Sequence, residues 1–288
     1  MRYSRVVCVL SGGGAKAAAH LGALKALEEW GLAPGHFVGT SMGAVIAACF
    51  AAGVTYEELL VRIGGVTRSD VARLSPFGLI SPFATHLLRA GPLRDTIADL
   101  VPARRFGELG VPLTVTATDI ESGQMVLFGA GGTDAPLVDA LYASCALPLF
   151  YPPGVIDGRR YADGGLRAVL PLDVAEQFDP DLVFAVNVGP TFSGDTTSGE
   201  LLPGMVKIHD MATRILMATQ IAQTIERWKN SQMPLVLVEP AVEPGTFGVR
   251  HAFAHVEAGY RAASRELAAW SETGTMGRGE RGKGKGTA

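Results

Sequence analysis

The sequence has few cysteines and almost no excess of charge, and both observations limit the classes of protein to which it can belong. Its three cysteines, Cys8, Cys49 and Cys145, are an odd number, lie far apart and are flanked by apolar residues. Such cysteines are typical of reduced thiols in a protein core, and their spacing fits no zinc site. We therefore expect a cytoplasmic protein without disulfide bonds.

Charged residues are also scarce, at 18% of the 288 residues, and the formal net charge is −3. Proteins that bind nucleic acid usually carry an excess of basic residues, so we expect no nucleic-acid partner. A local excess of basic residues occurs in the glycine-rich stretch 274–288, which has four basic residues and one acidic residue. This composition predicts a disordered tail after a single domain over residues 1–273.

No apolar run has the character of a membrane segment. The run at residues 6–10 is too short for the apolar part of a signal peptide and ends in glycines. Residues 37–56 lack charge over the length of a membrane span, but they contain Gly39, Ser41, Gly43 and Gly53. These small residues cluster where a strand is expected to turn into a helix, so we do not expect a transmembrane helix there.

Short apolar strands alternate with helices along the chain. Strands are predicted at residues 6–10, 37–39, 111–118, 125–128, 182–187 and 235–238, together with a hairpin over 155–161 that turns at Asp157-Gly158. Helices are predicted at residues 16–30, 44–52, 56–63, 205–228 and 252–270, and the fourth carries an apolar stripe at Ile208, Met211, Ile215, Thr219, Ala222 and Ile225. The alternation predicts an α/β protein whose sheet is parallel in its centre and covered by helices on both faces.

The first motif is Gly-Gly-Gly-Ala-Lys at residues 12–16, between a predicted strand and a predicted helix. Glycines let the backbone turn so that its N–H groups face an anion, and the helix behind them adds partial positive charge. The anion is either a phosphate or an oxyanion formed during a reaction. The spacing Gly12-x-Gly14-x-x-Ala17 also fits a dinucleotide fingerprint, but no acidic residue occurs at 34–38, where one is required.

The second motif is Gly-x-Ser-x-Gly at residues 39–43, again between a strand and a helix. It predicts that Ser41 stands on a strained elbow with small neighbours, although so short a pattern also occurs in ordinary turns. The third motif, Asp163-Gly164-Gly165, follows the predicted hairpin. Alone it indicates a turn, whereas beside the other two motifs Asp163 becomes a candidate base.

Together the three motifs resemble the patatin-like phospholipase family. The resemblance extends over roughly residues 6–267 and includes further stretches at 116–119, 143–148, 151–153 and 257–260. It implies a three-layer α/β/α sandwich with a mostly parallel central sheet. It also implies hydrolysis of acyl esters of phospholipids, lysophospholipids or related lipids, without a metal or another cofactor.

The resemblance further implies a Ser-Asp dyad. Ser41 would be the nucleophile and Asp163 the base. The oxyanion hole would be formed by Gly12, Gly13, Gly14 and Ala15, with motif support from Lys16, Ala17, Gly39, Gly43, Gly164 and Gly165. Such a dyad is chemically plausible if the carboxylate is desolvated and well aligned. A lipid substrate is compatible with peripheral contact with a membrane, and the oligomeric state is left open.

Other readings stay open at this point. An esterase of the α/β-hydrolase type would use a late histidine, for which His251 and His255 are the candidates, but the early glycine loop would then be unexplained. A non-catalytic lipid or protein adaptor on the same fold would not need an intact Ser41 and Asp163. A nucleotide-binding oxidoreductase lacks the expected acidic residue. His20, one turn after Lys16, either braces the glycine loop or is a partly buried polar residue.

Residues 75–92 have neither a helical nor a strand period. They contain the large apolar residues Phe77, Leu79, Ile80 and Phe83. We interpret the segment as an irregular or mobile flap that gates the substrate and meets the lipid surface. The alternative is an irregular part of the core, and the sequence favours neither.

Overall fold

The structure is a computed structural model that describes residues 3–75, 85–191, 204–231, 233–242 and 251–276. Two predicted features therefore fall mostly outside the described residues, namely the apolar flap, of which 76–84 are not described, and the tail beyond residue 276. The last helix reaches Met276, six residues past its predicted end.

Eight strands of the described chain form one mixed sheet. They are β1 (Val6–Leu10), β2 (Pro34–Thr40), β3 (Leu113–Asp119), β4 (Met125–Gly129), β5 (Gly154–Ile156), β6 (Arg159–Asp163), β7 (Leu182–Val186) and β8 (Leu235–Val238). The order is β5-β6-β3-β2-β1-β7-β8, with β4 also paired to β3. The strands from β3 through β2, β1 and β7 to β8 are parallel, whereas β4, β5 and β6 add antiparallel pairings. The predicted parallel centre is confirmed.

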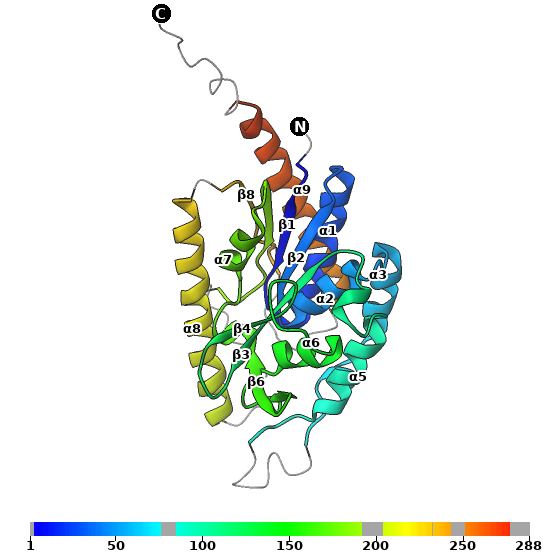
Figure 1. Cartoon of the computed structure of the whole chain (residues 1–288), viewed down its shortest axis with the longest axis vertical. Helices are drawn as coiled ribbons and strands as arrows, with labels where there is room; N and C mark the ends of the chain where they lie inside the picture. Colours follow the sequence, from blue (N-terminus) through cyan, green and yellow to red (C-terminus); the bar gives the residue numbers. More distant parts are fainter. Residues whose placement is uncertain (1–2, 76–84, 192–203, 232, 243–250, 277–288) are drawn as a thin grey trace, which may run out of the picture.

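Helices cover both faces of the sheet and complete the predicted three-layer α/β/α sandwich (Figure 1). One layer contains α1 (Ala18–Glu29), α2 (Met42–Ala51), α3 (Tyr56–Gly65), α5 (Ala90–Leu100), α6 (Leu137–Cys145) and α9 (Ala252–Met276), with the short α4 (Arg68–Val71) beside them. The opposite layer contains α7 (Leu172–Ala175) and the long α8 (Gly204–Lys229). Four 3-10 turns, at Gly14–Ala17, Phe106–Glu108, Gly164–Leu166 and Glu176–Phe178, connect these elements.

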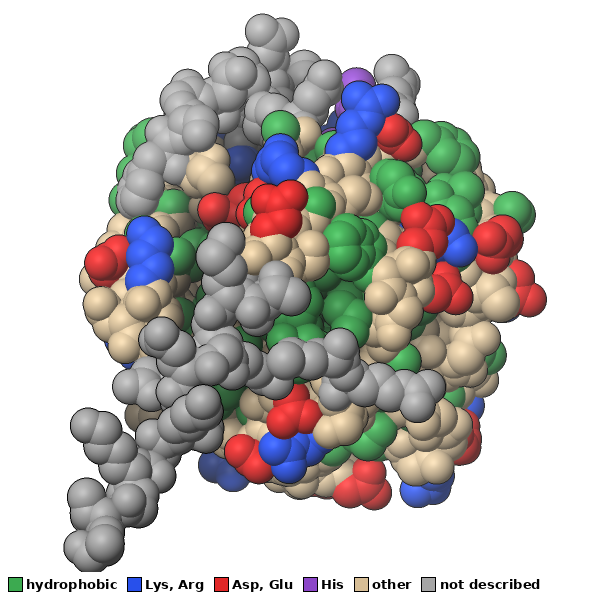
Figure 2. Space-filling view, turned by 90° about the horizontal axis from the view of Figure 1, so that it is seen from above, with side chains coloured by type: hydrophobic (Ala, Val, Ile, Leu, Met, Phe, Trp, Pro, Cys, Tyr) green, Lys and Arg blue, Asp and Glu red, His purple; other side chains and the backbone are tan. Residues whose placement is uncertain are grey.

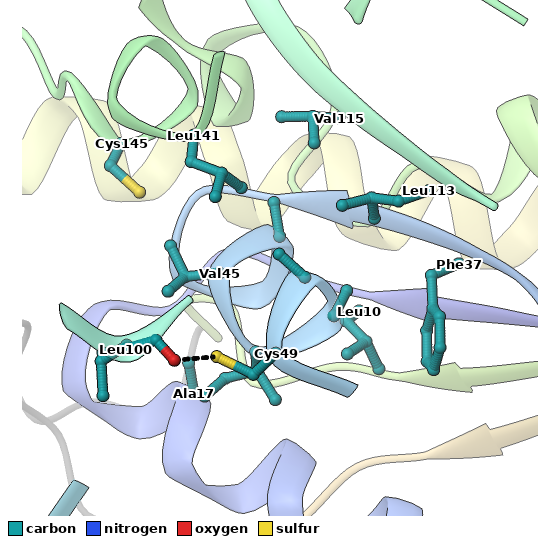
Figure 3. Packing of buried hydrophobic residues seen from close by; sticks show 14 of the residues in the cluster. Leu10, Ala17, Phe37, Val45, Cys49, Leu100, Leu113, Val115, Leu141 and Cys145 are labelled. Atoms are coloured by element: carbon teal, nitrogen blue, oxygen red, sulfur yellow. Dashed lines mark hydrogen bonds between the residues drawn. The ribbon is translucent and has the colours of Figure 1, made fainter. Parts of the chain in front are cut away.

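The alternation of side chains along β1 divides the core between the two layers. Val6, Cys8 and Leu10 belong to the larger cluster under α1 and α2, whereas Val7 and Val9 belong to the cluster under α7 and α8. Figure 3 shows part of the larger cluster. All three cysteines are buried free thiols, as their apolar surroundings predicted.

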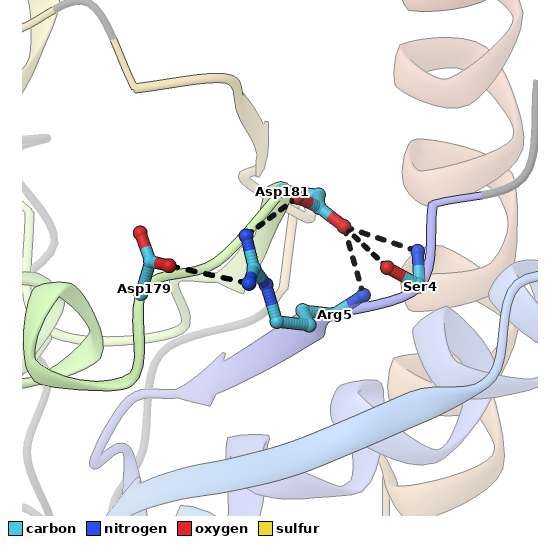
Figure 4. A network of polar contacts seen from close by, with 4 residues as sticks. All are labelled: Ser4, Arg5, Asp179 and Asp181. Carbon is cyan, nitrogen blue, oxygen red and sulfur yellow. Dashed lines mark hydrogen bonds and ion pairs between the residues drawn. The ribbon is translucent and has the colours of Figure 1, made fainter.

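A polar network joins the start of β1 to the start of β7 (Figure 4). Asp181 Oδ2 accepts hydrogen bonds from the backbone N–H of Ser4 and Arg5 and from the Ser4 hydroxyl. The Arg5 guanidinium reaches both Asp181 Oδ1, at 3.0 Å, and Asp179 Oδ2, at 3.2 Å. These contacts, chiefly the Ser4 hydroxyl, hold the pKa of Asp181 below its usual range.

Several local predictions are confirmed and one helix differs. Asp157 and Gly158 form the hairpin turn with φ of 48° and 76°, as a two-residue turn requires. Thr55 and Glu58 form the capping box of α3. On α8, however, the first half of the predicted apolar stripe faces outward, since Ile208, Met211 and Ile215 are exposed. The buried side of α8 instead carries Val206, Asp210, Ala218, Ile221 and Trp228.

The surface is charge-balanced on the face seen in Figure 2, where acidic and basic side chains are interspersed rather than gathered by sign. Within the residues that the structure describes, no helix combines the length and the apolar composition needed to cross a lipid bilayer.

Helices α1 and α9 pack so closely that neither tolerates a side chain at its crossing point. A Cβ atom at Gly22 of α1 would overlap the Val256 carbonyl of α9, and one at Gly259 would overlap the Ala19 carbonyl. The two backbones therefore meet directly across these glycines.

We predict that Gly22→Ala destabilises the fold, because an added methyl group must push the two helices apart. Overpacking of this kind typically costs about 1–3 kcal/mol of the free energy of unfolding. Denaturant unfolding measures the loss. The matched control is Gly65→Ala at the end of α3, where a Cβ meets no atom within 4 Å, so the control should leave stability unchanged or slightly raised. Equal stability of the Gly22 variant and wild type would contradict direct contact between α1 and α9.

Candidate active site

Ser41 stands on a strained turn between β2 and α2. Its φ and ψ are 53° and −134°, in a region that residues with side chains rarely adopt. The backbone N–H of Ser41 donates to Ser144 Oγ at 2.7 Å, which fixes the turn from outside. The flanking glycines allow close approach, since a Cβ at Gly43 would overlap the Ser11 carbonyl and one at Gly39 would overlap Ala44. The predicted elbow is present, with a ten-residue helix starting directly behind the serine.

The Ser41 hydroxyl donates to Asp163 Oδ2 at 2.8 Å. Asp163 ends β6, and its second oxygen, Oδ1, accepts the backbone N–H of Gly165 at 2.7 Å. The Thr118 hydroxyl donates to the Asp163 carbonyl and so fixes the end of the strand. Both carboxylate oxygens are thus oriented, and one of them meets the serine without an intervening group.

Burial sets the acidity of this carboxyl group. Asp163 is only 5% exposed, and the loss of water raises its pKa from 3.8 to about 6. The hydrogen bonds from Gly165 and Ser41 oppose the rise but do not cancel it. A carboxylate with a raised pKa is a stronger base than an ordinary one, and above pH 6 it is still ionised.

The glycine loop lies beside the elbow. The N–H of Gly12 donates to the Val169 carbonyl at 3.0 Å. By contrast, the N–H groups of Gly13 and Gly14 donate to no group in the described part of the chain. Gly14 has a φ of 58°, which lets the chain turn into the short 3-10 segment that continues through Ala15 to Ala17.

Three buried side chains brace this loop from behind. His20 contacts the Ser11 carbonyl through Nε2 at 2.9 Å, and burial lowers the pKa of His20 to about 4, so the ring is neutral. The Ser11 hydroxyl accepts the N–H of Val188 at 2.8 Å. Lys16 Nζ donates to the Gly189 carbonyl at 3.0 Å. The loop is thereby tied to α1 and to the turn after β7, and His20 is shown to be a brace.

A cavity of about 170 Å³ opens onto Ser41, Asp163 and residues 12–18. Most of its remaining wall is apolar and comes from Met42, Ile46, Ile63, Val66, Val71, Leu93, Leu100, Cys145, Leu147, Tyr151, Val169, Pro190, Met217 and Ala252. A smaller polar part includes Thr96, Asp210, Thr213 and Arg214. The site thus joins a hydrogen-bonded hydroxyl to a space that suits an apolar chain.

The fold brings all three predicted motifs to one place. Gly164 and Gly165 follow Asp163 in a 3-10 turn against β3. His251 and His255 do not line the cavity, and the direct contact of Ser41 with Asp163 leaves no position for an imidazole between them. The described residues contain no group of three or more His, Cys, Asp or Glu side chains arranged for a metal ion.

Sequence reasoning missed two kinds of site residue. Ser144 and Thr116 support the elbow, Thr116 through a 2.7 Å hydroxyl contact with Thr40. Both stand in stretches that matched the family pattern, which was the only available signal. Asp210 and Arg214 enter the cavity from α8, and no motif marks them.

A family model described as patatin-like phospholipase matches residues 8–176 of the chain. An uncharacterised NTE family protein of Mycobacterium tuberculosis is 34% identical over 196 residues, which cover 68% of this chain and 52% of that protein. Patatin-like phospholipase domain-containing protein 7 of Rattus norvegicus is 29% identical over 202 residues, covering 69% of this chain and 15% of that protein. The chain therefore spans about half the length of the mycobacterial relative.

Solved structures give distant likenesses. The ExoU–SpcU complex of Pseudomonas aeruginosa aligns with 93% of this chain and 52% of that chain, with 18% identity and a TM-score of 0.44. VipD of Legionella pneumophila covers 93% of this chain and 67% of its own, with 14% identity and a TM-score of 0.44. Human GIVD cytosolic phospholipase A2 covers 85% and 50%, with 11% identity and a TM-score of 0.41.

We predict that Asp163→Asn makes the folded protein more stable at pH 8. The ionised carboxylate is disfavoured by burial, whereas asparagine is neutral and of the same shape. A pKa raised from 3.8 to about 6 corresponds to about 1–3 kcal/mol in the free energy of unfolding. The raised pKa favours the fold fully below pH 4, and that contribution is lost as the pH rises through 6, so the advantage of the variant should vanish below pH 4.

Urea unfolding at pH 8 and pH 4 measures this difference. Asp119→Asn is the matched control, because amide hydrogen bonds, above all that from Ser122, lower the pKa of Asp119. Asp119 thus favours the fold at pH 8, and its removal should destabilise the protein there. A less stable Asp163→Asn protein at pH 8 would show that Asp163 is not a disfavoured buried charge.

Proposed function

The chain belongs to the patatin-like phospholipase family, and from that membership we propose that it is a serine lipid acyl hydrolase with a Ser41–Asp163 dyad. The 2.8 Å hydrogen bond between Ser41 Oγ and Asp163 Oδ2, at the mouth of an apolar cavity, is the observation that carries the proposal. The substrate is an acyl ester of a phospholipid, a lysophospholipid or a related lipid. The reaction uses no metal or other cofactor.

The first half of the reaction transfers the acyl group to Ser41. Ser41 Oγ attacks the ester carbonyl carbon while its proton passes to Asp163 Oδ2. The tetrahedral intermediate then collapses, the bond from carbon to the alcohol oxygen breaks, and the leaving alkoxide takes the proton from Asp163. The products of this half are a free alcohol and an ester on Ser41.

The N–H groups of Gly13 and Gly14 stabilise the oxyanion. The N–H of Gly12 already donates to the Val169 carbonyl, so the N–H groups that can donate to an oxyanion are those of residues after Gly12. The amino end of α2 adds partial positive charge next to Ser41. Removal of one such donor costs about 10²–10³ in rate in other acyl-transfer enzymes, so the loop is a large part of catalysis.

Water completes the cycle. Asp163 accepts a proton from a water molecule, whose oxygen attacks the carbonyl carbon of the acyl-enzyme. The second tetrahedral intermediate releases the fatty acid, and Ser41 Oγ recovers its proton from Asp163. Both steps need Asp163 ionised in the resting enzyme, which its pKa of about 6 provides at neutral pH.

A non-catalytic adaptor on the same fold is the competing function. A strained serine and a buried carboxylate both lower stability, and an adaptor gains nothing from keeping them. The site therefore favours an enzyme. The buried, unpaired cysteines agree with a cytoplasmic location, which we include in the proposal.

We also propose that the enzyme meets lipid surfaces through an apolar ridge on α8. The ridge consists of Met205, Ile208, Met211, Ile215 and Leu216, each at least 45% exposed. The opposite side of the same helix lines the cavity through Asp210, Thr213, Arg214 and Met217. A helix that walls the site on one side and is apolar on the other is suited to lie on the surface from which the substrate comes.

We predict that Ser41→Ala and Asp163→Asn each lower ester hydrolysis by about 10³-fold or more, and that the double variant is little worse than either. The two residues act in one proton transfer, so removal of either abolishes it. A panel of phospholipids, lysophospholipids and a soluble chromogenic ester measures the rates, and a fluorophosphonate probe should label Ser41. Ser122→Ala and Asp173→Asn are exposed controls. Substantial turnover by Asp163→Asn would contradict the dyad.

We predict that Ile208→Ser combined with Ile215→Ser lowers hydrolysis of long-chain lipid in vesicles several-fold. Hydrolysis of a soluble short-chain ester should persist, because the ridge points away from the cavity. Trp30→Ser changes an exposed apolar side chain at the far end of α1 and is the control. Equal loss on both substrates would contradict the surface role. A change of oligomeric state in size-exclusion chromatography would instead assign the ridge to self-association.

A further inference from the structure

The carbonyl that His20 contacts fixes the tautomer of its ring. The side chain is fully buried on α1, and its Nε2 lies 2.9 Å from the Ser11 carbonyl oxygen. A carbonyl oxygen can only accept a hydrogen bond, so Nε2 carries the proton. Burial lowers the pKa of His20 to about 4, so the ring is neutral and Nδ1 is bare at neutral pH. Nδ1 has no hydrogen-bond partner in the described part of the chain, where the hydrogen bonding of the ring is directed to Ser11.

The Ser11 carbonyl belongs to the peptide group that opens the glycine loop. The N–H of this same peptide group is that of Gly12, which donates to the Val169 carbonyl at 3.0 Å. A peptide group is planar, so hydrogen bonds at its oxygen and at its nitrogen together fix its orientation. One of these bonds comes from α1, and the other comes from the segment between the 3-10 turn Gly164–Leu166 and α7.

The orientation of this first peptide group decides where the loop donors point. The next two peptide groups carry the N–H groups of Gly13 and Gly14. Glycine restricts backbone rotation less than any other residue, so these groups do not hold their own direction. The second of them is fixed through its oxygen, because the Gly13 carbonyl accepts the N–H of Lys16 at 3.3 Å. The first lies between that group and the one that His20 fixes.

We propose that His20 is a positioning residue of the oxyanion hole, which acts through the peptide group of Ser11 and Gly12 on the N–H groups of Gly13 and Gly14. The inference rests on the proposed function, in which these N–H groups bind the oxyanion, and adds the residue that orients them. His20 itself is absent from the described residues that line the cavity, so it meets neither the substrate nor the reacting atoms.

A residue that orients the oxyanion hole has a distinct kinetic signature. The oxyanion forms only on the way through the tetrahedral intermediates, so a displaced loop weakens binding of the transition state but not of the ester. His20→Leu removes the donor and keeps a side chain of similar size. On a soluble chromogenic ester it should lower kcat and kcat/KM equally, about tenfold or more, with KM unchanged. His20→Gln places an amide N–H near the position of Nε2 and should restore most of the rate.

His36 supplies the matched control. It is also buried, its pKa is lowered by burial to about 4, and its Nε2 contacts Thr114 Oγ1 at 2.9 Å. It lies near the start of β2, whereas Ser41 follows the end of that strand. His36→Leu should therefore lower the free energy of unfolding, as His20→Leu does, and leave kcat and KM at their wild-type values.

Three kinetic results would overturn the proposal. The first is a wild-type kcat in a folded His20→Leu protein. The second is a loss in His20→Leu that His20→Gln does not reverse. The third is an equal loss of kcat in His36→Leu, which would show that the rate follows stability and not the orientation of the loop.

Two further measurements need no turnover and so separate this inference from the proposed function. In wild type, NMR of the ¹⁵N-labelled histidine rings should show His20 neutral with its proton on Nε2 at neutral pH, and a proton on Nδ1 would overturn the proposal even if no variant folds. Backbone hydrogen exchange over residues 11–17 should be faster in His20→Leu than in wild type or His20→Gln, and unchanged exchange would overturn the proposal. If wild type hydrolyses no ester, the proposed function fails, and these measurements still decide whether His20 orients the loop.

Discussion

The hydrogen bond between Ser41 and Asp163 imposes a constraint on the whole sheet. Ser41 follows β2 and Asp163 ends β6, and both strands are neighbours of β3. Two strands separated by a third lie roughly 9–10 Å apart, too far for a serine and an aspartate that remain in the sheet. The elbow lifts Ser41 over the end of its strand, and Gly164 lets the chain after β6 lie against Thr116 of β3. The two side chains therefore meet above β3.

Several features that lower the stability of the fold lie around this contact. Ser41 has a strained backbone, Asp163 and Lys16 are ionisable groups held away from water, and His20 is neutral in the core. Each is surrounded by well-buried elements: β1 and most of β2 are buried, and α2 consists almost wholly of apolar residues. The stability of the apolar layers offsets the cost of the site.

Features encoded by neighbouring residues could be predicted from the sequence. The elbow at 39–43, the hairpin turn at Asp157-Gly158 and the capping box at Thr55 each depend on a few adjacent residues, and all three are present. The orientation of α8 could not be predicted, because its apolar stripe has a helical period whether it faces the core or the solvent. Arg214 reaches the cavity only through tertiary packing, and no motif in the sequence marks it. For Ser144 the sequence offered only the family-like stretch 143–148, which does not say that its hydroxyl supports the elbow. The catalytic role of Ser41 and Asp163 stays a prediction, although their contact is now observed.

The direction of β6 has a consequence for how this fold can vary. β6 runs antiparallel to β3, and its partners within β3 are Ala117, Thr118 and Asp119, which extend beyond the end of β2. The candidate base is thus delivered by a strand that approaches from outside the parallel sheet, while the candidate nucleophile comes from within it. Pairing with β3 and the hydrogen bond from the Thr118 hydroxyl to its carbonyl fix the position of Asp163. Residues inserted at the distant turn of the β5–β6 hairpin should therefore lengthen its tip and leave the carboxylate in place. The exposed turn at Asp157-Gly158 is therefore separated from the candidate base by the length of β6, whereas the hairpin residues Ile156 and Tyr161 are part of the buried core.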